Sequence, residues 1–440
     1  MPAEDSSRRP QVVIVGAGFG GLAAARRLRH ADVDVTLVDR TNHHLFQPLL
    51  YQCAAGAISS SDCAAPIRPS LKRSTNTTVL MDEVTDIDPD QSHVQLASGP
   101  RLDYDSLIVA CGAQTSYFGH DEWEEVTYGL KTLEDAISLR QHFYRALEEA
   151  ELSNSAAERA QFLTFIVVGG GPTGVEIAGE LALTVSDMKR QYRRADTSEA
   201  KVILLDAGDR VVSAFDEKLS RKVAEQLGKL GVTVREGARA TAIDARGVTI
   251  EVGGATERID SRTVIWAAGV RSVPLTDALA RAAAAKTDRS GRIEINPDLT
   301  LPGHPEISVI GDGASVAGPN GHPLPGLATV AIQQAHHVAK AIKDGERGAT
   351  TPFKYLDKGA LAVVGRGKAV CEIRGLKLSG WPAFLTYLGV HLYYLGGQMG
   401  RRIGVLMKWV GARFGQRQSA LIASELGSLD QEASSPHAVR

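Results

Sequence analysis

The chain has 440 residues, which is long for a single hydrophobic core, so two or three domains are expected. A formal net charge of -2 and only 5% aromatic residues argue against a nucleic-acid partner, because a phosphate-binding surface needs a basic excess. The four cysteines form no C-x-x-C pair and match no iron–sulfur or zinc ligand pattern, so no metal site is expected. The same cysteine pattern indicates a reduced, cytosol-facing protein, and residues 1–10 are polar and lack the apolar stretch of a secretion signal, so export is not expected.

An order of strand, glycine turn, helix and strand occurs twice along the chain. Two copies of this unit predict an α/β fold with two Rossmann-like dinucleotide-binding domains. The elements expected in the two copies are, in order, residues 11–15, 22–29, 33–39, 162–168, 175–194 and 202–206.

Further elements are expected between and after the two copies. The remaining predictions are an amphipathic helical connection at 133–161, strands near 233–237, 248–252 and 263–268, a glycine- and proline-rich segment at 301–326, a helix at 329–343 and strands from 353 onward.

The first glycine run, GAGFGG, fits the pattern G-x-G-x-x-G with Gly16, Gly18 and Gly21. The first glycine permits a tight turn, the second lets a pyrophosphate approach the backbone, and the third lets helix and strand pack closely. Asp39 ends the second strand at about the 20-residue spacing of a carboxylate that binds a ribose hydroxyl. A lone glycine turn is common in α/β proteins, but the complete strand, turn, helix, strand and acid context favours a dinucleotide site.

Two further strand ends carry small residues, in LIVACGA at 107–113 and VIGDG at 309–313. Together with the first glycine run, they resemble the A-T-G-like turn and the G-D motif of the two-dinucleotide-binding flavoproteins. This resemblance implies FAD at the first glycine run, with Gly112 lining the cofactor and Asp312 binding its ribityl chain. The alternative is that both segments are ordinary strand-end turns.

The second glycine run, GGGPTG, fits the same pattern with Gly169, Gly171 and Gly174. Asp206 ends the next strand, after a longer gap that contains several basic residues. A carboxylate there accepts hydrogen bonds from a 2′-hydroxyl and repels a 2′-phosphate, so NADH is expected rather than NADPH. The nearby Arg210 weakens this preference.

Two more residues of the second copy are candidates for NADH contacts. Gly269 ends the segment WAAG, which resembles the second A-T-G-like turn of these flavoproteins. Glu176 follows the third glycine, and the resemblance implies that it faces the nicotinamide and the flavin as a catalytic residue. The alternative for Glu176 is a carboxylate favoured by the helix dipole in the first helical turn.

The positions of the cysteines argue against one class of flavoprotein, the disulfide reductases. A disulfide reductase needs a pair of redox cysteines, but residues 42–58 contain only Cys53 and the segment after Gly112 contains none. One thiol cannot carry out dithiol exchange, so this class is not expected.

Three motifs together resemble the type II NADH dehydrogenases, which are single-chain NADH:quinone oxidoreductases. They are HHLFQPLLYQ at 43–52, GGGPTGVE at 169–176 and YLDKGALAVVGR at 355–366, and the resemblance extends over residues 11–426. It implies that Gln47, in the first motif, contacts FAD.

The quinone motif of this family, A-Q-x-A-x-Q, has an altered counterpart in this chain. The segment ATVAIQ keeps the last glutamine as Gln333, while the first glutamine is replaced by Thr329. An amide donates from its nitrogen and accepts at its oxygen, whereas the threonine hydroxyl has only one oxygen for both. This replacement changes the expected geometry of a quinone site. The alternative for Gln333 is an amide on a helix surface. The resemblance implies quinone contacts from Ala328, Thr329, Ala331, Ile332 and Gln333, with Gln333 also catalytic.

The end of the chain has the composition of a membrane-associating segment. Residues 378–400 are uncharged, although proline, histidine and glycines interrupt the run. Residues 401–417 predict a basic amphipathic helix, which favours peripheral, monotopic attachment to anionic lipid over spanning. The alternative is a helix packed on another helix or in a homodimer interface.

These predictions combine into one organisation and one activity. An FAD-binding domain is expected at 1–120 and 295–350, an NADH-binding domain at 160–294, strands and membrane-surface helices at 351–426, and a disordered tail at 427–440. The resemblance implies hydride transfer from NADH to FAD, then two electrons to a membrane quinone at the cytoplasmic face of the cell membrane, without proton pumping. Two alternatives stay open: a reductase with another acceptor, such as a small carrier protein or a specialised naphthoquinone, and a redox-sensing flavoprotein with slow turnover.

Overall fold

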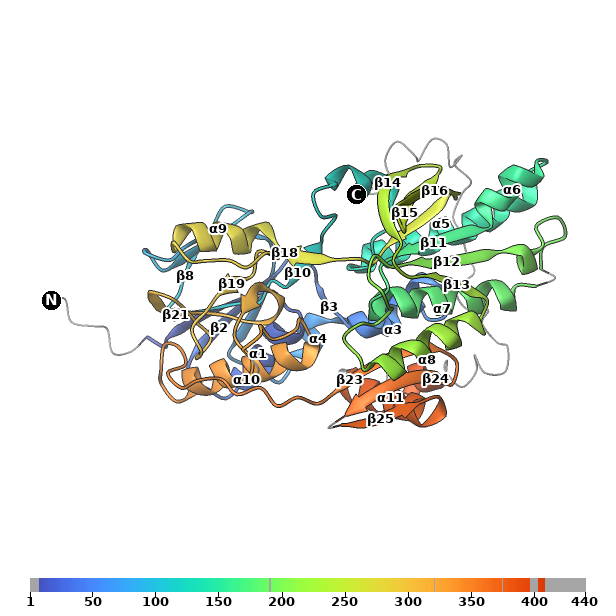
Figure 1. Cartoon of the computed structure of the whole chain (residues 1–440). Helices are drawn as coiled ribbons and strands as arrows, with labels where there is room; N and C mark the ends of the chain where they lie inside the picture. Colours follow the sequence, from blue (N-terminus) through green and yellow to red (C-terminus); the bar gives the residue numbers. More distant parts are fainter. Residues whose placement is uncertain (1–7, 190, 320, 374, 396–402, 408–440) are drawn as a thin grey trace. The chain divides into compact units, whose positions relative to one another are not determined.

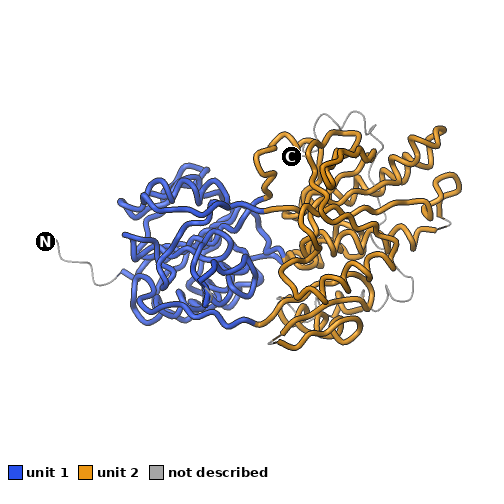
Figure 2. The backbone as a smooth tube through the Cα atoms, viewed as in Figure 1, with its two compact units in different colours: residues 1–45, 65–114, 270–357 blue, residues 46–64, 115–269, 358–440 orange. Residues whose placement is uncertain are grey.

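The computed structural model describes residues 8–189, 191–319, 321–373, 375–395 and 403–407 (Figure 1). The chain forms two compact units, each assembled from three segments (Figure 2). Unit 1 contains residues 1–45, 65–114 and 270–357, and unit 2 contains residues 46–64, 115–269 and 358–440. Compared with the predicted domains, residues 46–64 fall in unit 2 and residues 270–294 fall in unit 1.

Unit 1 is built around a six-stranded sheet in the order β20-β21-β9-β1-β2-β5. All neighbouring pairs are parallel except β20 with β21. The strands are β1 (Gln11–Val15), β2 (Asp34–Asp39), β5 (Thr77–Met81), β9 (Ser106–Val109), β20 (Thr300–Leu301) and β21 (His304–Val309).

Alternate side chains of β1 pack against two different layers of unit 1, one on each face of the sheet. Val12 and Ile14 pack into a layer formed by helices α1 (Phe19–Leu28) and α10 (Ala328–Lys343), which also pack on each other. Val13 and Val15 face the opposite layer, where helix α9 (Pro274–Ala282) and a small antiparallel sheet supply the apolar side chains. That sheet consists of β6 (Val84–Asp88), β7 (His93–Leu96) and β8 (Arg101–Asp103). Because both faces are covered, the four residues of β1 that follow Gln11 are apolar and buried.

Unit 2 repeats the arrangement with a four-stranded parallel sheet in the order β13-β12-β11-β17. These strands are β11 (Thr164–Val168), β12 (Lys201–Leu205), β13 (Val232–Arg235) and β17 (Thr263–Trp266). The helices of this unit include α5 (Leu133–Leu152), α6 (Ala156–Phe162), α7 (Pro172–Asp187) and α8 (Glu217–Gly228), and a second, antiparallel sheet contains β14 (Arg239–Asp244), β15 (Gly247–Val252) and β16 (Ala255–Asp260).

The C-terminal part of unit 2 is a three-stranded antiparallel sheet covered by a helix. It contains β23 (Ala360–Gly365), β24 (Lys368–Ile373), β25 (Leu376–Ser379) and α11 (Trp381–Tyr394). Ala383 and Tyr387 of α11 are buried against Val363 and Cys371. The backbone of α7 approaches β23 closely, because a side chain at Gly179 would overlap the carbonyl oxygen of Val364.

Short elements complete the described chain. They are β3 (His43–Leu45), η1 (Gln47–Leu49), α2 (Leu50–Ala54), α3 (Ser60–Cys63), β4 (Ala64–Pro66), α4 (Ile67–Ser70), β10 (Ala113–Thr115), η2 (Asp121–Val126), η3 (Thr197–Glu199), β18 (Val270–Ser272), β19 (Ile293–Glu294), η4 (Gly311–Gly313) and β22 (Ala314–Ser315).

The predicted α/β class is confirmed, but several predicted helices have different bounds, including α1, which was expected at 22–29 and begins at Phe19. The helical connection is two helices, because the Ser155 side chain accepts the N–H of Glu158 and begins α6. The helix expected at 175–194 begins earlier, at Pro172, and ends at Asp187. The basic residues beyond it do not extend the helix, because the backbone N–H groups of Arg193 and Arg194 donate to the Glu151 carboxylate.

Membrane expectations fall partly beyond the described residues. Within the described part of the chain, no helix is long and apolar enough to cross a membrane. Of the expected basic helix at 401–417, residues 403–407 are described and helical, and the others, with the tail at 427–440, lie outside the described residues.

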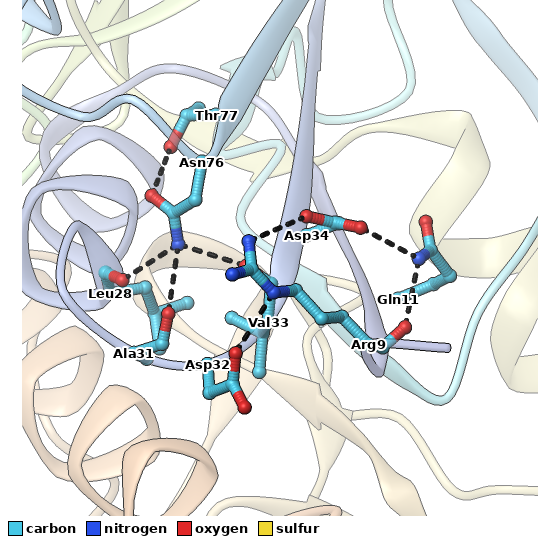
Figure 3. A network of polar contacts seen from close by, with 9 residues as sticks. All are labelled: Arg9, Gln11, Leu28, Ala31, Asp32, Val33, Asp34, Asn76 and Thr77. Carbon is cyan, nitrogen blue, oxygen red and sulfur yellow. Dashed lines mark hydrogen bonds and ion pairs between the residues drawn. The ribbon is translucent and has the colours of Figure 1, made fainter. Parts of the chain in front are cut away.

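Asn76 fastens the connection between α1 and β2 in unit 1 (Figure 3). Its side-chain Nδ2 donates to the carbonyl oxygens of Leu28, Ala31 and Val33 at 3.0, 3.3 and 3.0 Å. Arg9 and Gln11 also contact acidic residues at the start of β2, but these contacts are exposed and contribute little to stability.

Replacing Asn76 with Ala is expected to lower the free energy of unfolding by about 1–3 kcal/mol, because three carbonyl groups lose the hydrogen bond from its side chain. Thermal denaturation should show a lower midpoint for the variant. Gln91→Ala, at an exposed amide of the same unit, is the control and should leave the midpoint unchanged. Equal midpoints for the two variants would contradict this role.

Candidate dinucleotide-binding sites

The first glycine loop follows β1 in unit 1 and permits two close backbone approaches. Gly16 has φ +96°, and a Cβ atom there would lie 2.5 Å from the carbonyl oxygen of Ala110. A Cβ at Gly21 would overlap the carbonyl oxygen of Gly16. These two positions therefore require glycine for the loop itself.

Gly18 differs, because the loop does not require it. It is the extended N-cap of α1, and a Cβ built there meets no described atom within 4 Å. No side chain of the described residues caps this helix. The backbone at the N-terminus of α1 is thus open to an anionic group, which fits a pyrophosphate.

Asp39 and His44 hold the residue between the first two glycines. The Oδ2 atom of Asp39 accepts the N–H of Ala17 at 2.6 Å, and its Oδ1 atom accepts the N–H and hydroxyl of Thr41 at 2.7 and 2.8 Å. Nδ1 of the buried His44 donates to the carbonyl oxygen of Ala17 at 2.9 Å, and the His44 ring meets Phe19 edge-on. Sequence reasoning missed the role of His44, although it belongs to the HHLFQPLLYQ motif.

Gly112 and Asp312 lie at the same edge of the sheet as the first glycine loop. In the sheet register Val109 is paired with Val15 and with Val309, so the segments that follow β1, β9 and β21 leave at one edge. Asp312 belongs to the turn η4, and Gly112 has φ +74°. The structure therefore brings these two residues to the edge where the glycine loop begins.

Gln334 is a second residue that the sequence did not reveal. Its side chain is only 1% exposed, and its Oε1 atom accepts the N–H of Gly311 at 2.7 Å. The buried amide fixes the turn that carries Asp312 to helix α10. The sequence has two adjacent glutamines at 333–334, but only Gln333 matched the quinone motif, so Gln334 was not considered.

Gln47 is not in the unit that contains the other FAD candidates. It begins η1 in unit 2, and its Nε2 atom donates to the carbonyl oxygen of Lys131 at 3.3 Å.

The second glycine loop, in unit 2, repeats the geometry of the first. Gly169 has φ +112°, and a Cβ at Gly174 would overlap the Gly169 carbonyl oxygen. Gly171 is the extended N-cap of α7, and a Cβ there meets no described atom within 4 Å. The Oδ2 atom of Asp206 accepts the N–H of Gly170 at 2.5 Å, and its Oδ1 atom accepts the N–H of Gly208 at 2.7 Å. This loop also fits a pyrophosphate at a helix N-terminus.

A strained residue supports the second loop. Val212 is buried with φ +44°, an uncommon conformation for a β-branched residue, and its N–H donates to the Gly170 carbonyl oxygen at 2.7 Å. Arg210, which was expected to weaken the preference for NADH, donates from Nη2 to the carbonyl oxygen of Ser213 at 3.0 Å.

Gly269 follows β17 in unit 2, at the same sheet edge as the second glycine loop. Its carbonyl oxygen accepts the N–H of Ser116 at 3.1 Å. A Cβ atom at Gly269 would overlap the ring of Phe118, so this ring lies directly over the glycine.

Glu176 lies one turn further into α7 than expected. Because the helix begins at Pro172, no acidic residue occupies its first turn, and the helix-dipole explanation for Glu176 is wrong. The Oε1 atom of Glu176 accepts the N–H of Val363 at 3.4 Å. Burial raises the pKa of Glu176 to about 8, and the hydrogen bond from Val363 opposes this shift only in part.

A cluster of buried polar rings lies in the same unit as Glu176. The hydroxyl groups of Tyr51 and Tyr387 are 3.2 Å apart, and the His391 ring lies 3.8 Å from the Tyr387 ring. Burial raises the pKa of both tyrosines, and the charges of Glu176 and Glu180 raise it further. Burial also lowers the pKa of His391 to about 4. Sequence reasoning missed this cluster because its members come from two distant segments, α2 and α11.

The expected quinone motif occupies the first turns of α10 in unit 1. Ala328, Thr329 and Ile332 are half-buried, and Ala331 is buried. The Thr329 hydroxyl lies 3.3 Å from the Tyr355 hydroxyl.

Gln333 connects this helix to the chain that follows Tyr355. Its amide accepts the N–H of Leu356 at 3.0 Å and donates to the carbonyl oxygens of Leu356 and Thr329 at 3.0 and 3.1 Å. The half-buried Gln333 therefore connects α10 to the following segment.

A second thiol lies next to Cys53, contrary to the count made from sequence. Cys63 lies just beyond residues 42–58, in which only Cys53 was found. It forms a side-chain hydrogen bond with Cys53, and this bond lowers the Cys53 pKa. Both cysteines are fully buried in unit 2, as expected of structural rather than reactive thiols. Among the described residues, no three histidine, cysteine or acidic side chains are grouped so as to hold a metal ion.

Comparisons with known proteins agree with this geometry. Residues 10–335 match the model of the pyridine nucleotide-disulphide oxidoreductase family. The chain is 43% identical over 433 residues to the type II NADH:quinone oxidoreductase Ndh of Mycobacterium tuberculosis, covering 96% of this chain and 92% of that protein. It is also 43% identical to NdhA of the same organism, covering 91% of this chain and 86% of that protein.

A solved structure shares the fold. The structure of NDH2 from Plasmodium falciparum in complex with NADH aligns with a TM-score of 0.84 at 20% identity, covering 94% of this chain and all of that chain. The fold, the duplicated glycine loops and the sequence identity over nearly the whole chain together show that this chain belongs to the type II NADH:quinone oxidoreductases, within the pyridine nucleotide-disulphide oxidoreductase family.

Proposed function

We propose that this protein oxidises NADH and reduces a quinone, with FAD as its resident cofactor. The observation that carries the proposal is the duplicated loop, in which an acidic residue holds the backbone of each glycine turn while the helix N-terminus stays open. When bound, FAD accepts a hydride from NADH and passes two electrons to the quinone.

We assign FAD to the first loop and NADH to the second. Unit 1 has the additional turn that carries Asp312, which Gln334 fixes from helix α10. Gly16, Gly18 and Gly21 would accommodate the FAD pyrophosphate, and Asp39 its ribose. Gln47 and Gly112 are further candidates for contact with the cofactor. This assignment places the FAD-binding and NADH-binding domains in unit 1 and unit 2.

In unit 2, Gly169, Gly171 and Gly174 would bind the pyrophosphate of NADH. Asp206 would accept hydrogen bonds from the adenosine ribose, and its charge disfavours the 2′-phosphate of NADPH. The guanidinium of Arg210 is engaged with Ser213, which supports a preference for NADH. Glu176 is neutral at pH 7 and would offer a hydrogen-bond donor to the substrate.

We assign the quinone to the first turns of α10. Thr329 and Gln333 bring hydroxyl and amide groups there, and Ala328, Ala331 and Ile332 supply small and apolar side chains. Membership in the quinone oxidoreductases supports this choice over another acceptor. Tyr355 is an additional candidate because its hydroxyl lies beside that of Thr329.

We further propose that the protein attaches peripherally to the cytoplasmic face of a membrane, where quinones are dissolved. Helix α11 leaves Trp381, Leu385 and Tyr393 exposed, and Ile403 and Met407 are exposed in the short helical segment that follows. Exposed apolar side chains near a basic sequence are typical of interfacial attachment to anionic lipid.

Paired glycine substitutions test the assignment of the two loops. Gly18→Ala is expected to fold but to lose FAD, because the methyl group projects into open space where the pyrophosphate would lie. Gly171→Ala should keep its FAD and show a KM for NADH that is raised roughly tenfold. Gly228→Ala, at an open glycine in helix α8, is the control and should change neither property.

Flavin absorbance at about 450 nm, followed under anaerobic conditions, measures both steps. NADH should bleach the parent protein rapidly, and a quinone analogue should restore the colour. Bleaching without recovery would reject the quinone, and full FAD and activity in both alanine variants would contradict the loop assignment.

The ionisation of Glu176 predicts a pH dependence of substrate binding. Its carboxyl group is protonated below the pKa of about 8 and charged above it. The KM for NADH should therefore rise severalfold as the pH increases through this value, because the anion repels the dinucleotide phosphates and cannot donate a hydrogen bond. Glu176→Gln stays neutral and should flatten the profile. Parallel profiles for the variant and the parent would rule out this role.

Removal of residues 401–440 is expected to release the protein from vesicles that contain anionic lipid. Co-sedimentation measures the binding, and FAD content verifies that the shortened chain is folded. Removing only residues 428–440, the polar end, is the control and should preserve binding. Retention of the shorter chain on vesicles would contradict this attachment. A loss of dimers with unchanged lipid binding would instead favour a homodimer interface.

A further inference from the structure

Phe118, in unit 2, combines two properties that are unusual for a large apolar residue. Its side chain is 66% exposed, and its backbone has φ +55°. The next residue, Gly119, has φ +93°, and the N–H of His120 donates to the carbonyl oxygen of Tyr117 at 3.1 Å. Two central residues with positive φ are typical of a type I′ turn, which favours Asn, Asp or Gly. Phenylalanine in the first central position is therefore strained.

The surrounding structure imposes this conformation on Phe118. The indole Nε1 of Trp266 donates to the carbonyl oxygen of Ser116 at 2.9 Å, and the N–H of Ser116 donates to Gly269. On the other side of the turn, the buried Tyr117 and Trp123 rings each lie 5.4 Å from the Trp266 ring. A strained and exposed residue that is held from both sides is the kind of feature that marks functional sites.

The ring of Phe118 lies over the turn that ends β17. A Cβ atom at Gly269 would overlap this ring, and the ring centre is 6.3 Å from that of Trp266. Gly269 lies at the carboxyl edge of the parallel sheet, where the glycine loop and Asp206 also lie.

The strand order sets the direction of a dinucleotide along this edge. Asp206 follows β12, the glycine loop follows β11, and Gly269 follows β17, in the spatial order β12-β11-β17. A dinucleotide with its adenosine ribose at Asp206 and its pyrophosphate at Gly171 must extend its second nucleoside toward β17. This step rests on the proposed assignment of NADH to unit 2.

We propose that Phe118 determines specificity at the nicotinamide end of NADH, by packing its exposed ring against the nicotinamide riboside. A rigid aromatic side chain offers a large apolar surface with little loss of conformational entropy, which suits a planar ring. This role explains why an aromatic residue occupies a turn position that suits asparagine or glycine.

Phe118→Asn and Phe118→Gly test this role without loss of the fold, because both residues tolerate the positive φ. Their thermal midpoints should equal or exceed that of the parent, since strain is removed. In the FAD-loaded protein, the Kd for NAD⁺ should rise roughly tenfold, whereas the Kd for ADP-ribose, which lacks nicotinamide, should stay unchanged. Phe118→Tyr should retain the parent affinity for both ligands. Leu152→Asn, at another exposed apolar position in unit 2, is the control and should change neither Kd.

Three outcomes would overturn the proposal. Unchanged NAD⁺ affinity in Phe118→Gly would show that the ring makes no useful contact. An equal loss for NAD⁺ and ADP-ribose would place the effect away from the nicotinamide end. Failure of the parent protein to bind either ligand would reject the NADH assignment of unit 2, and the role of Phe118 with it.

Discussion

In both units, a carboxylate at the end of the second strand accepts a hydrogen bond from the backbone N–H of the residue after the first glycine. Asp39 holds Ala17 in this way, and Asp206 holds Gly170. The carbonyl oxygen of the same residue is also bonded, by His44 in unit 1 and by Val212 in unit 2. Because both backbone polar groups of this one residue are hydrogen-bonded, the loop keeps its shape while the helix N-terminus behind it stays open.

This constraint determines which glycines each loop needs and why. Gly21 and Gly174 are required because the helix passes against the carbonyl group of the first glycine. Gly18 and Gly171 meet no described atom where a Cβ would lie, so these two positions leave room for a ligand beside the helix N-terminus. One glycine of each loop is needed for packing, and another leaves the backbone accessible to a phosphate. This difference is the physical basis for proposing that the loops bind phosphates.

Sequence reasoning succeeded where function depends on neighbours along the chain. The loops, the strand-end acids and the α/β class follow from local order, which turn chemistry and strand patterning encode. It failed where residues meet only through the fold. The pairing of Tyr51 with Tyr387, the contact of Cys63 with Cys53 and the bond from Gln334 to Gly311 join separate segments, and no spacing rule predicts them. The start of α7 was misplaced because Pro172 was treated as part of the turn rather than as the first helical residue.

The near-identity of the two loops means that the loops alone do not distinguish FAD from NADH. The difference must come from residues at the far end of each nucleotide, where the two ligands differ chemically. In unit 1 the sheet edge where the glycine loop begins carries Asp312, in a turn that the buried Gln334 fixes through the N–H of Gly311. In unit 2 the turn that follows β17 carries Gly269 with the strained Phe118 ring over it, which is an apolar surface. Under the proposed function, the residues that each sheet presents beside its loop therefore determine which dinucleotide the loop binds.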